Sequence, residues 1–315
     1  MVDTPNENAS DDNASIAPLL LGVIWSLGTV AVVVLFLRLY TAVRIVQRVK
    51  PEDYLMLAAL LCALVQTCLL TVSVRWGLGR HIGTLSEEQV MHAAKFFILF
   101  EGWSVASTAF GRISFSVYLL QIVVINRMRK FLLYSFIAGQ AIVNGLTIIL
   151  IYVQCGTQPA AMWDPSIEAD CWSPRVQRDF GFFQCSYNSL TDLFLTIFPI
   201  IIVWNLQLSW YKKLGISVLL GVSVVTFIES VIKGYSIKVL GEGVDVTWNI
   251  VPFLIWAVSE GFIIIIAASV PSLCPLVRKR RRTSTYQRTY EMDGSEQQRS
   301  KRGLVKRPDV LESSL

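Results

Sequence analysis

Seven stretches of the chain are apolar over the length that a helix needs to cross a lipid bilayer. The hydrocarbon core of a bilayer is roughly 30 Å thick, and a helix covers it with about 20 predominantly apolar residues. The stretches are Pro18–Val43, Asp53–Arg75, Phe96–Val124, Phe131–Gln154, Phe180–Leu206, Leu214–Val239 and Trp248–Cys274. Because the connections between them are short, the sequence predicts an all-α membrane protein built as a seven-transmembrane helix bundle.

The composition agrees with a membrane protein and gives no sign of a nucleic-acid partner. Hydrophobic residues make up 53% of the chain and charged residues only 16%, whereas a soluble domain has about 25% charged residues. The net charge of +5 arises from the C-terminal tail, which has eleven Lys or Arg and five Asp or Glu from Arg278 onward. Basic residues beside a membrane segment are typical of a cytosolic anchor.

The distribution of Lys and Arg over the loops predicts the orientation, because cytosolic loops are enriched in these residues. The basic set of loops contains Arg44, Arg48, Lys50, Arg127, Arg129, Lys130, Lys212, Lys213 and the run Arg278–Arg282. The alternate loops, with the acidic N-terminal tail, contain few Lys or Arg. We therefore predict an outside N-terminal tail (1–17), a membrane domain (18–276) and a disordered, basic cytosolic tail (277–315).

Three kinds of modification are predicted from local motifs. Asn8 and Asn13 begin Asn-x-Ser triplets in the tail placed outside, so they are candidate glycosylation sites. Cys155 and Cys171 lie in the predicted outer loop after the fourth span, where an oxidising environment would let them pair. That disulfide would shape the loop over the outer face or contribute directly to a ligand site. Ser284 follows Arg281-Arg282-Thr283, as in a site for a kinase that recognises basic residues, so it is a candidate phosphorylation site. The alternative is that these arginines only anchor the tail to the cytosolic face of the membrane.

Ionisable residues inside the predicted spans are the strongest indication of a functional site. Each costs about 2.5–3.5 kcal/mol on insertion scales, so a membrane protein rarely carries one without a role. Apart from Glu101, which lies higher in the third span toward the outside, those near the middle of a span are Arg112 in the third, Asp192 in the fifth, Glu229 and Lys233 in the sixth, and Glu260 in the seventh. At 1.5 Å per residue, all lie within about two turns of the bilayer midplane. We therefore predict that the bundle brings them together.

The spacing of these residues predicts how they pair. Glu229 and Lys233 are four residues apart on one helix face, which leaves Arg112 for Asp192 or Glu260. One carboxylate is then in excess, and we expect it to carry a proton. Asn188 lies one turn before Asp192 and joins the candidate set. These groups form a ligand pocket or switch, a set of structural ion pairs, or a path for proton transport or acid catalysis.

Several familiar chemistries are not predicted. The seventh span has no lysine between Thr247 and Val277 for a retinal Schiff base. Zinc signatures, phosphate-binding glycine loops and nucleophile elbows are absent from the sequence. His81 and His92 lie near the second predicted loop, where solvent exposure is a simpler expectation than metal binding. We therefore predict no metal and no cofactor.

An ordered series of motifs carries a family resemblance. The motifs are Pro51-Glu52-Asp53-Tyr54-Leu55, GLGRHIGTL at Gly77–Leu85, the Cys155–Cys171 loop with Pro159, Trp163 and Pro165, NSLTDL and FPIIIVWNLQ in the fifth span, Lys212-Lys213-Leu214-Gly215, and Glu260 with SVPSLCPL in the seventh. Together they resemble the fungal rhodopsin-domain family of seven-helix, GPCR-like membrane proteins of filamentous fungi, from roughly Arg38 to Leu276. The resemblance implies a receptor-like integral membrane protein, and some family members belong to secondary-metabolite gene clusters.

The resemblance also assigns family positions and shows departures from them. The family positions are Asp53, Cys155, Cys171, Asn188, Asp192, Pro199 and Glu260. Arg112 stands where the family usually has lysine, and Gln121 and Lys233 stand where it usually has arginine. The third span lacks an acidic-Arg-Tyr triplet and the seventh lacks Asn-Pro-x-x-Tyr, which argues against ordinary G-protein coupling.

The first functional prediction is a sensor without retinal. A small molecule would reach the charged groups from beneath the Cys155–Cys171 loop, and helices five to seven would shift around Pro199 and Pro271. A cytosolic signalling partner would contact the inner loops and the tail, and the plasma membrane is the expected location. The alternatives are a cyclase-like membrane enzyme and a non-catalytic membrane component of a secondary-metabolite pathway, for which an internal membrane fits.

Overall fold

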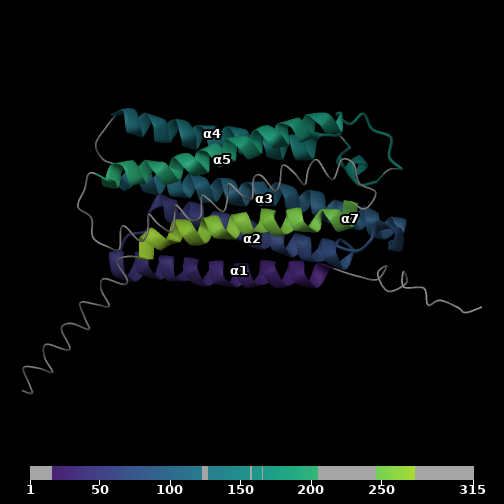
Figure 1. Ribbon diagram of the computed structural model, residues 1–315, viewed down its shortest axis with the longest axis horizontal. Helices are drawn as coiled ribbons and strands as arrows, with labels where there is room; N and C mark the ends of the chain where they lie inside the picture. The colour runs from purple at the N-terminus through teal and green to yellow at the C-terminus, as the bar shows by residue number, and fades with distance from the viewer. Residues whose placement is uncertain (1–15, 123–126, 157, 165, 205–245, 274–315) are drawn as a thin grey trace, which may run out of the picture.

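A computed structural model describes residues 16–122, 127–156, 158–164, 166–204 and 246–273 of the chain, and the regular structure of these residues is helical throughout (Figure 1). Its elements are α1 (Ala17–Tyr40), the π-helical turn η2 (Thr41–Val46), α2 (Pro51–Arg75), the short helix η3 (Ile82–Thr84), α3 (Glu87–Ile122), α4 (Arg127–Val153), the short helix η4 (Pro159–Met162), α5 (Pro174–Trp204) and α7 (Val246–Asn249). After a turn at Ile250, α7 continues as a helix over 251–273.

Among the described residues, four helices are long and apolar enough to cross a membrane. They are Ala17–Val46, Pro51–Arg75, Arg127–Val153 and Thr247–Leu273, which correspond to the first, second, fourth and seventh predicted spans. α3 and α5 cover the third and fifth predicted spans. These helices are consistent with an integral multi-pass membrane protein. The sixth predicted span lies outside the described residues, so the count of seven and the orientation stay predictions.

The helix Thr247–Leu273 lies inside the bundle, whereas α1 and α4 lie on its outside. Figure 1 shows α4 beside α5 along one flank and α1 along the other, with α2 and α3 between them. In the most apolar 18-residue stretch of the helix Thr247–Leu273, 67% of the residues are buried. The corresponding share is 28% for the helix that contains α1 and 28% for α4. Exposed apolar side chains such as Phe36 on α1 and Phe131 on α4 face outward. An exposed apolar surface of this kind is expected for helices that contact lipid.

The motif that begins at Gly77 is hydrogen-bonded, at one end of the bundle, to the start of the first helix and to the start of the helix Thr247–Leu273. Gly77 and Gly79 have φ angles of 115° and 91°, a left-handed conformation that favours glycine. The Gly79 amide donates a hydrogen bond to the Thr247 carbonyl at 3.1 Å. The Gly79 carbonyl accepts a hydrogen bond from the Ile16 amide at 3.4 Å. His81 and His92 are both half-buried, so their solvent exposure is only partial. His81 stacks on Trp248 with ring centroids 4.3 Å apart, and the His92 ring lies 4.4 Å from that of Trp76.

Two helices begin earlier than the apolar pattern predicts. α3 begins at Glu87 instead of Phe96, because Ser86 and Gln89 form a reciprocal cap in which each backbone amide donates to the other side chain. α5 begins at Pro174 instead of Phe180, and proline is favoured in the first turn because its φ already suits a helix. Both extensions are polar, so hydrophobicity alone does not reveal them.

Candidate functional site

Arg112 joins two carboxylates from two other helices in the middle of the bundle. Its Nε donates to Oδ1 of Asp192 at 2.9 Å and its Nη2 to Oδ2 at 3.0 Å, which is a bidentate pair. Nη2 also donates to Oε1 of Glu260. We call Arg112, Asp192 and Glu260 the Arg112 cluster. It connects α3, α5 and the helix Thr247–Leu273, so the sequence-predicted partners Asp192 and Glu260 are both in contact with Arg112.

The Arg112 cluster is almost completely shielded. The Arg112 side chain is 2% exposed, and those of Asp192 and Glu260 are 12% and 11% exposed. Within the cluster, one guanidinium faces two carboxylates. Glu229 and Lys233 lie outside the described residues, so the predicted excess of one carboxylate stays a prediction. A buried charge that loses its partner is strongly destabilising, which makes the arrangement sensitive to the relative positions of the three helices.

Polar atoms with unused hydrogen-bonding capacity lie in the same part of the bundle. In the described structure, Nη1 of Arg112 and both amide atoms of Gln66 on α2 are buried without a hydrogen-bond partner. Gly261, next to Glu260, faces this amide, and a Cβ on Gly261 would lie 3.7 Å from Nε2 of Gln66. Buried polar atoms are normally paired, because leaving one unpaired costs about 1–3 kcal/mol. Nη1 of Arg112 is thus a buried donor that the described structure leaves without an acceptor.

Asn188 belongs to a different set of contacts from the one that the sequence predicts. Oδ1 of Asn188 accepts from Nε2 of Gln140 at 3.3 Å, and Nδ2 of Asn188 donates to Oδ1 of Asn144 at 3.4 Å. Asn144 also donates to Oε1 of Gln140 at 2.7 Å and accepts from Gln184 at 3.0 Å. These amides are shared between α4 and α5, so the described hydrogen bonds of the Asn188 side chain connect those two helices, and none of them goes to Arg112.

A second buried ion pair, at the opposite end of the bundle from the disulfide, was not predicted. Arg38 on α1 pairs with Asp53 on α2, Nε to Oδ1 at 2.9 Å, and its side chain is 1% exposed. Nη1 of Arg38 donates to the Ala268 carbonyl at 2.9 Å. Beside it, Gln121 on α3 donates to the carboxylate of Glu52. We call Arg38, Glu52, Asp53 and Gln121 the Arg38 network. Arg38, an ionisable residue within the first apolar span, is the signal that could have revealed it.

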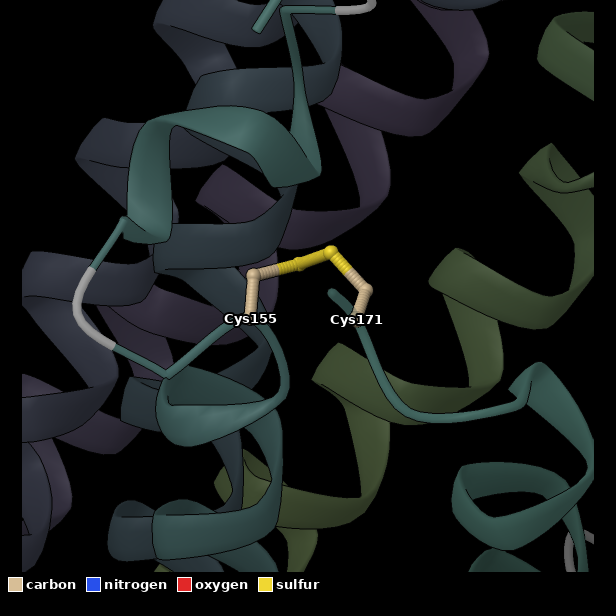
Figure 2. The surroundings of a disulfide bond; sticks show 2 residues. All are labelled: Cys155 and Cys171. Carbon is tan, nitrogen blue, oxygen red and sulfur yellow. A yellow bond between two sulfur atoms is a disulfide. The ribbon is translucent and has the colours of Figure 1, made fainter. Parts of the chain in front are cut away.

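The structure confirms the predicted pairing of Cys155 with Cys171, which closes a loop over the end of α4 (Figure 2). The bond joins residues 16 apart in the chain. Next to it, the Trp172 amide donates to the Gln154 carbonyl at 2.9 Å. The loop is thereby fixed against α4 before α5 begins.

Removal of this disulfide is expected to lower stability substantially. A cross-link over a loop of this length constrains the unfolded chain, and its loss typically costs about 2–4 kcal/mol. Cys155→Ser with Cys171→Ser should therefore unfold at a lower temperature than the wild-type protein in the same detergent. Cys68→Ser changes an exposed free thiol and is the matched control. Equal unfolding temperatures for the double variant and the control would contradict this expectation.

A cavity lies beneath the disulfide loop. Its volume is about 590 Å³, within the range of small-molecule sites. The lining residues come from α3, from the end of α4, from the loop and from the start of α5, and include Phe97, Glu101, Met162, Cys171, Trp172 and Gln177. We call this space the disulfide-loop cavity. It lies on the side from which the sequence predicts that a ligand approaches.

The remaining predicted positions fall into two groups. Pro199 lies within α5, and Pro271 lies in the helical segment 251–273. Asn8, Asn13, Glu229, Lys233, Ser284 and Pro275 lie outside the described residues. Their predicted roles therefore stay predictions. Within the residues that the structure describes, no group of three His, Cys, Asp or Glu side chains is placed to hold a metal ion.

The helices and their buried charges define a multi-pass helical membrane protein. The sequence profile described as the Fungal rhodopsin domain matches residues 37–279. Since this match covers most of the chain, the protein belongs to the fungal rhodopsin-domain family. No solved structure matches the chain significantly.

One relative of the chain is named for a biosynthesis cluster. The chain is 24% identical over 138 residues to the Fugralins biosynthesis cluster protein 2 of Gibberella zeae. The match covers 42% of this chain and 33% of the relative, so it spans about a third of that protein's length.

Proposed function

We propose that the protein is a receptor-like sensor of a small molecule and that the Arg112 cluster is its switch. The observation that carries this proposal is that one guanidinium on α3 holds both Asp192 on α5 and Glu260 on the helix Thr247–Leu273. A ligand under the disulfide loop would favour one arrangement of these helices over another. The sensor uses no retinal.

The geometry of the guanidinium supports a switch with discrete positions. Asp192 uses two nitrogens of Arg112, whereas Glu260 shares one of those two. A small shift of either helix would strengthen one pair at the expense of the other, and packed interfaces favour two arrangements over a continuous range. Pro199 and Pro271 each remove a helical hydrogen bond, so bends are allowed in the two helices that carry the carboxylates.

The test separates a switch from a set of structural ion pairs. Asp192→Asn, tagged and returned to a fungal strain from which the gene has been deleted, should fold like the wild type but fail to restore the phenotype of that deletion. Folding is measured as the monodisperse fraction in detergent, and the phenotype as the transcript and metabolite profiles. Asp179→Asn is the matched control, because Asp179 lies on the same helix and its side chain is 69% exposed.

Two outcomes would count against the sensor. A folded Asp192→Asn protein that restores the full phenotype would show that the carboxylate is not needed for a response. A variant that fails to fold would favour a structural role for the ion pairs. The sensor predicts a location in the plasma membrane and a cytosolic partner at the inner loops and tail, which a fluorescent fusion and affinity capture from solubilised membranes would test.

A second candidate function is a membrane component of a secondary-metabolite pathway. The relative named for a fugralins biosynthesis cluster favours this candidate. In its enzymatic form, an intramembrane carboxyl group such as Glu260 would act as a general acid on an apolar substrate, as in a membrane cyclase. Microsomes with the protein should then convert a pathway intermediate, and Glu260→Gln microsomes should not. A non-catalytic component would instead show a stable partner and tolerate Glu260→Gln.

A further inference from the structure

We propose that the disulfide-loop cavity binds a small organic cation, with Glu101 as its counter-ion. The inference rests on the proposed sensor function, because it names the chemical class of the molecule that is sensed. It concerns a site separate from the Arg112 cluster. Glu101 and Arg112 are eleven residues apart on α3, which is roughly 16 Å along a helix.

The cavity has the size and lining of a site for a small amphipathic molecule. Its volume of about 590 Å³ is bordered by apolar and aromatic side chains, including Phe97, Ile98, Met162 and Trp172. Among the described residues that line it, Glu101 is the one ionisable side chain. Sites of this kind combine an apolar wall with a few polar groups that fix the orientation of the ligand.

Glu101 has no ion-pair partner among the residues that the structure describes. In the described part of the chain, the Lys and Arg ion pairs go to other carboxylates, and none goes to Glu101. Lys95, six residues earlier on α3, points to the Trp163 ring, with Nζ 5.6 Å from its centroid. A carboxylate in a largely apolar cavity is favourable only with a partner, and a protonated amine supplies both a charge and donors.

Two further features favour a cation over an anion. Phe97 and Trp172 line the cavity, and aromatic rings attract cations through their π faces. The segment 155–179 has four acidic residues (Asp164, Glu168, Asp170 and Asp179) and two basic residues (Arg175 and Arg178), so it is net negative by two charges. A negative rim raises the local concentration of cations and lowers that of anions.

Glu101 is held on a tightly packed part of α3, which suits it to transmit binding. Its neighbour Gly102 lies against the Tyr152 ring of α4, where a Cβ would collide with the hydroxyl. The Tyr152 hydroxyl donates to the Leu99 carbonyl at 3.1 Å. A ligand bound to Glu101 would therefore act on a well-anchored helix, and the same helix carries Arg112.

The experiment measures equilibrium binding of radiolabelled 2-phenylethylamine to the full-length protein in lipid nanodiscs. We expect saturable binding that Glu101→Gln weakens about 10-fold or more, because a hydrogen bond to a charged group is lost. Glu87→Gln removes the same charge from an exposed position on the same helix and should leave binding unchanged. The neutral 2-phenylethanol and the anionic 3-phenylpropionate should compete about 10-fold or more weakly than unlabelled amine.

A second variant tests the cavity without touching the carboxylate. Ala161 lines the cavity from η4, and Ala161→Phe should fill part of it and abolish binding of the amine. The proposal is overturned if the folded wild-type protein shows no saturable binding, if the alcohol competes as well as the amine, or if Glu101→Gln and Ala161→Phe bind like the wild type.

Failure of this site and failure of the sensor have different signatures. If the amine does not bind but Asp192→Asn still folds and loses the phenotype, the site is wrong and the sensor stands. If the amine binds through Glu101 but Asp192→Asn keeps the full phenotype, the cavity is a binding site and the Arg112 cluster is not its switch.

Discussion

Arg112→Met is expected to destabilise the protein by about 3–5 kcal/mol, because it leaves Asp192 and Glu260 buried without their shared cation. A loss of this size is a large fraction of the stability of a typical domain. The variant should therefore accumulate poorly in membranes and elute as aggregate after solubilisation. The effect is measured by heating the detergent-solubilised protein and recording, at each temperature, the fraction that remains monodisperse.

Two controls separate the charge of Arg112 from its shape. Arg112→Lys keeps the charge but loses the planar fork that pairs with Asp192 through two nitrogens, so it should lie between the wild type and Arg112→Met. Adding Asp192→Asn and Glu260→Gln to Arg112→Met removes the two carboxylate charges that have lost Arg112 and should recover much of the lost stability. If Arg112→Met unfolds at the wild-type temperature, the cluster does not hold the three helices together.

Arg38→Met is expected to cost a similar amount, about 3–5 kcal/mol, at the end of the bundle opposite the disulfide. The substitution leaves Asp53 without its cation and removes the donor to the Ala268 carbonyl, so α1 loses its ion pair with α2 and its hydrogen bond to the helix Thr247–Leu273. Arg44→Met is the matched control, because Arg44 lies one and a half turns later on an exposed face. The measurement is again the unfolding temperature in detergent.

Asp53→Asn added to Arg38→Met tests the physical cause. The double variant removes the uncompensated charge, while an asparagine oxygen can still accept the hydrogen bond from the Lys50 amide, which is 3.1 Å from Oδ2 of Asp53. It should therefore be more stable than Arg38→Met alone. If the two variants have the same unfolding temperature, the loss of stability arises from the packing of the arginine stem and not from the charge.

The depth of the charges could be predicted from the sequence because helices have a fixed rise per residue. That argument places Arg112, Asp192 and Glu260 at one height, and the structure brings the three side chains into contact. The pairing of Cys155 with Cys171 could be predicted from their shared loop. Depth says nothing, however, about which helices are neighbours, and for this reason the partner of Arg38 was not predicted.

Asn188 shows the limit of reasoning from helix faces. Asn188 and Asp192 are four residues apart, but at 3.6 residues per turn they differ by about 40° around the helix. On a helix packed between two neighbours, that angle is enough to direct one side chain to each. Asn188 accordingly contacts α4 through Gln140 and Asn144, while Asp192 contacts α3 through Arg112.

The most direct test of the switch is the phenotype of Glu260→Gln scored together with its folding. The substitution keeps the shape of the side chain, and Arg112 keeps its bidentate pair with Asp192, so the helices should remain packed. The proposed function predicts a monodisperse protein at the wild-type level that does not restore the phenotype of the deletion strain. A folded Glu260→Gln protein that restores it fully would contradict a switching role for the Arg112 cluster.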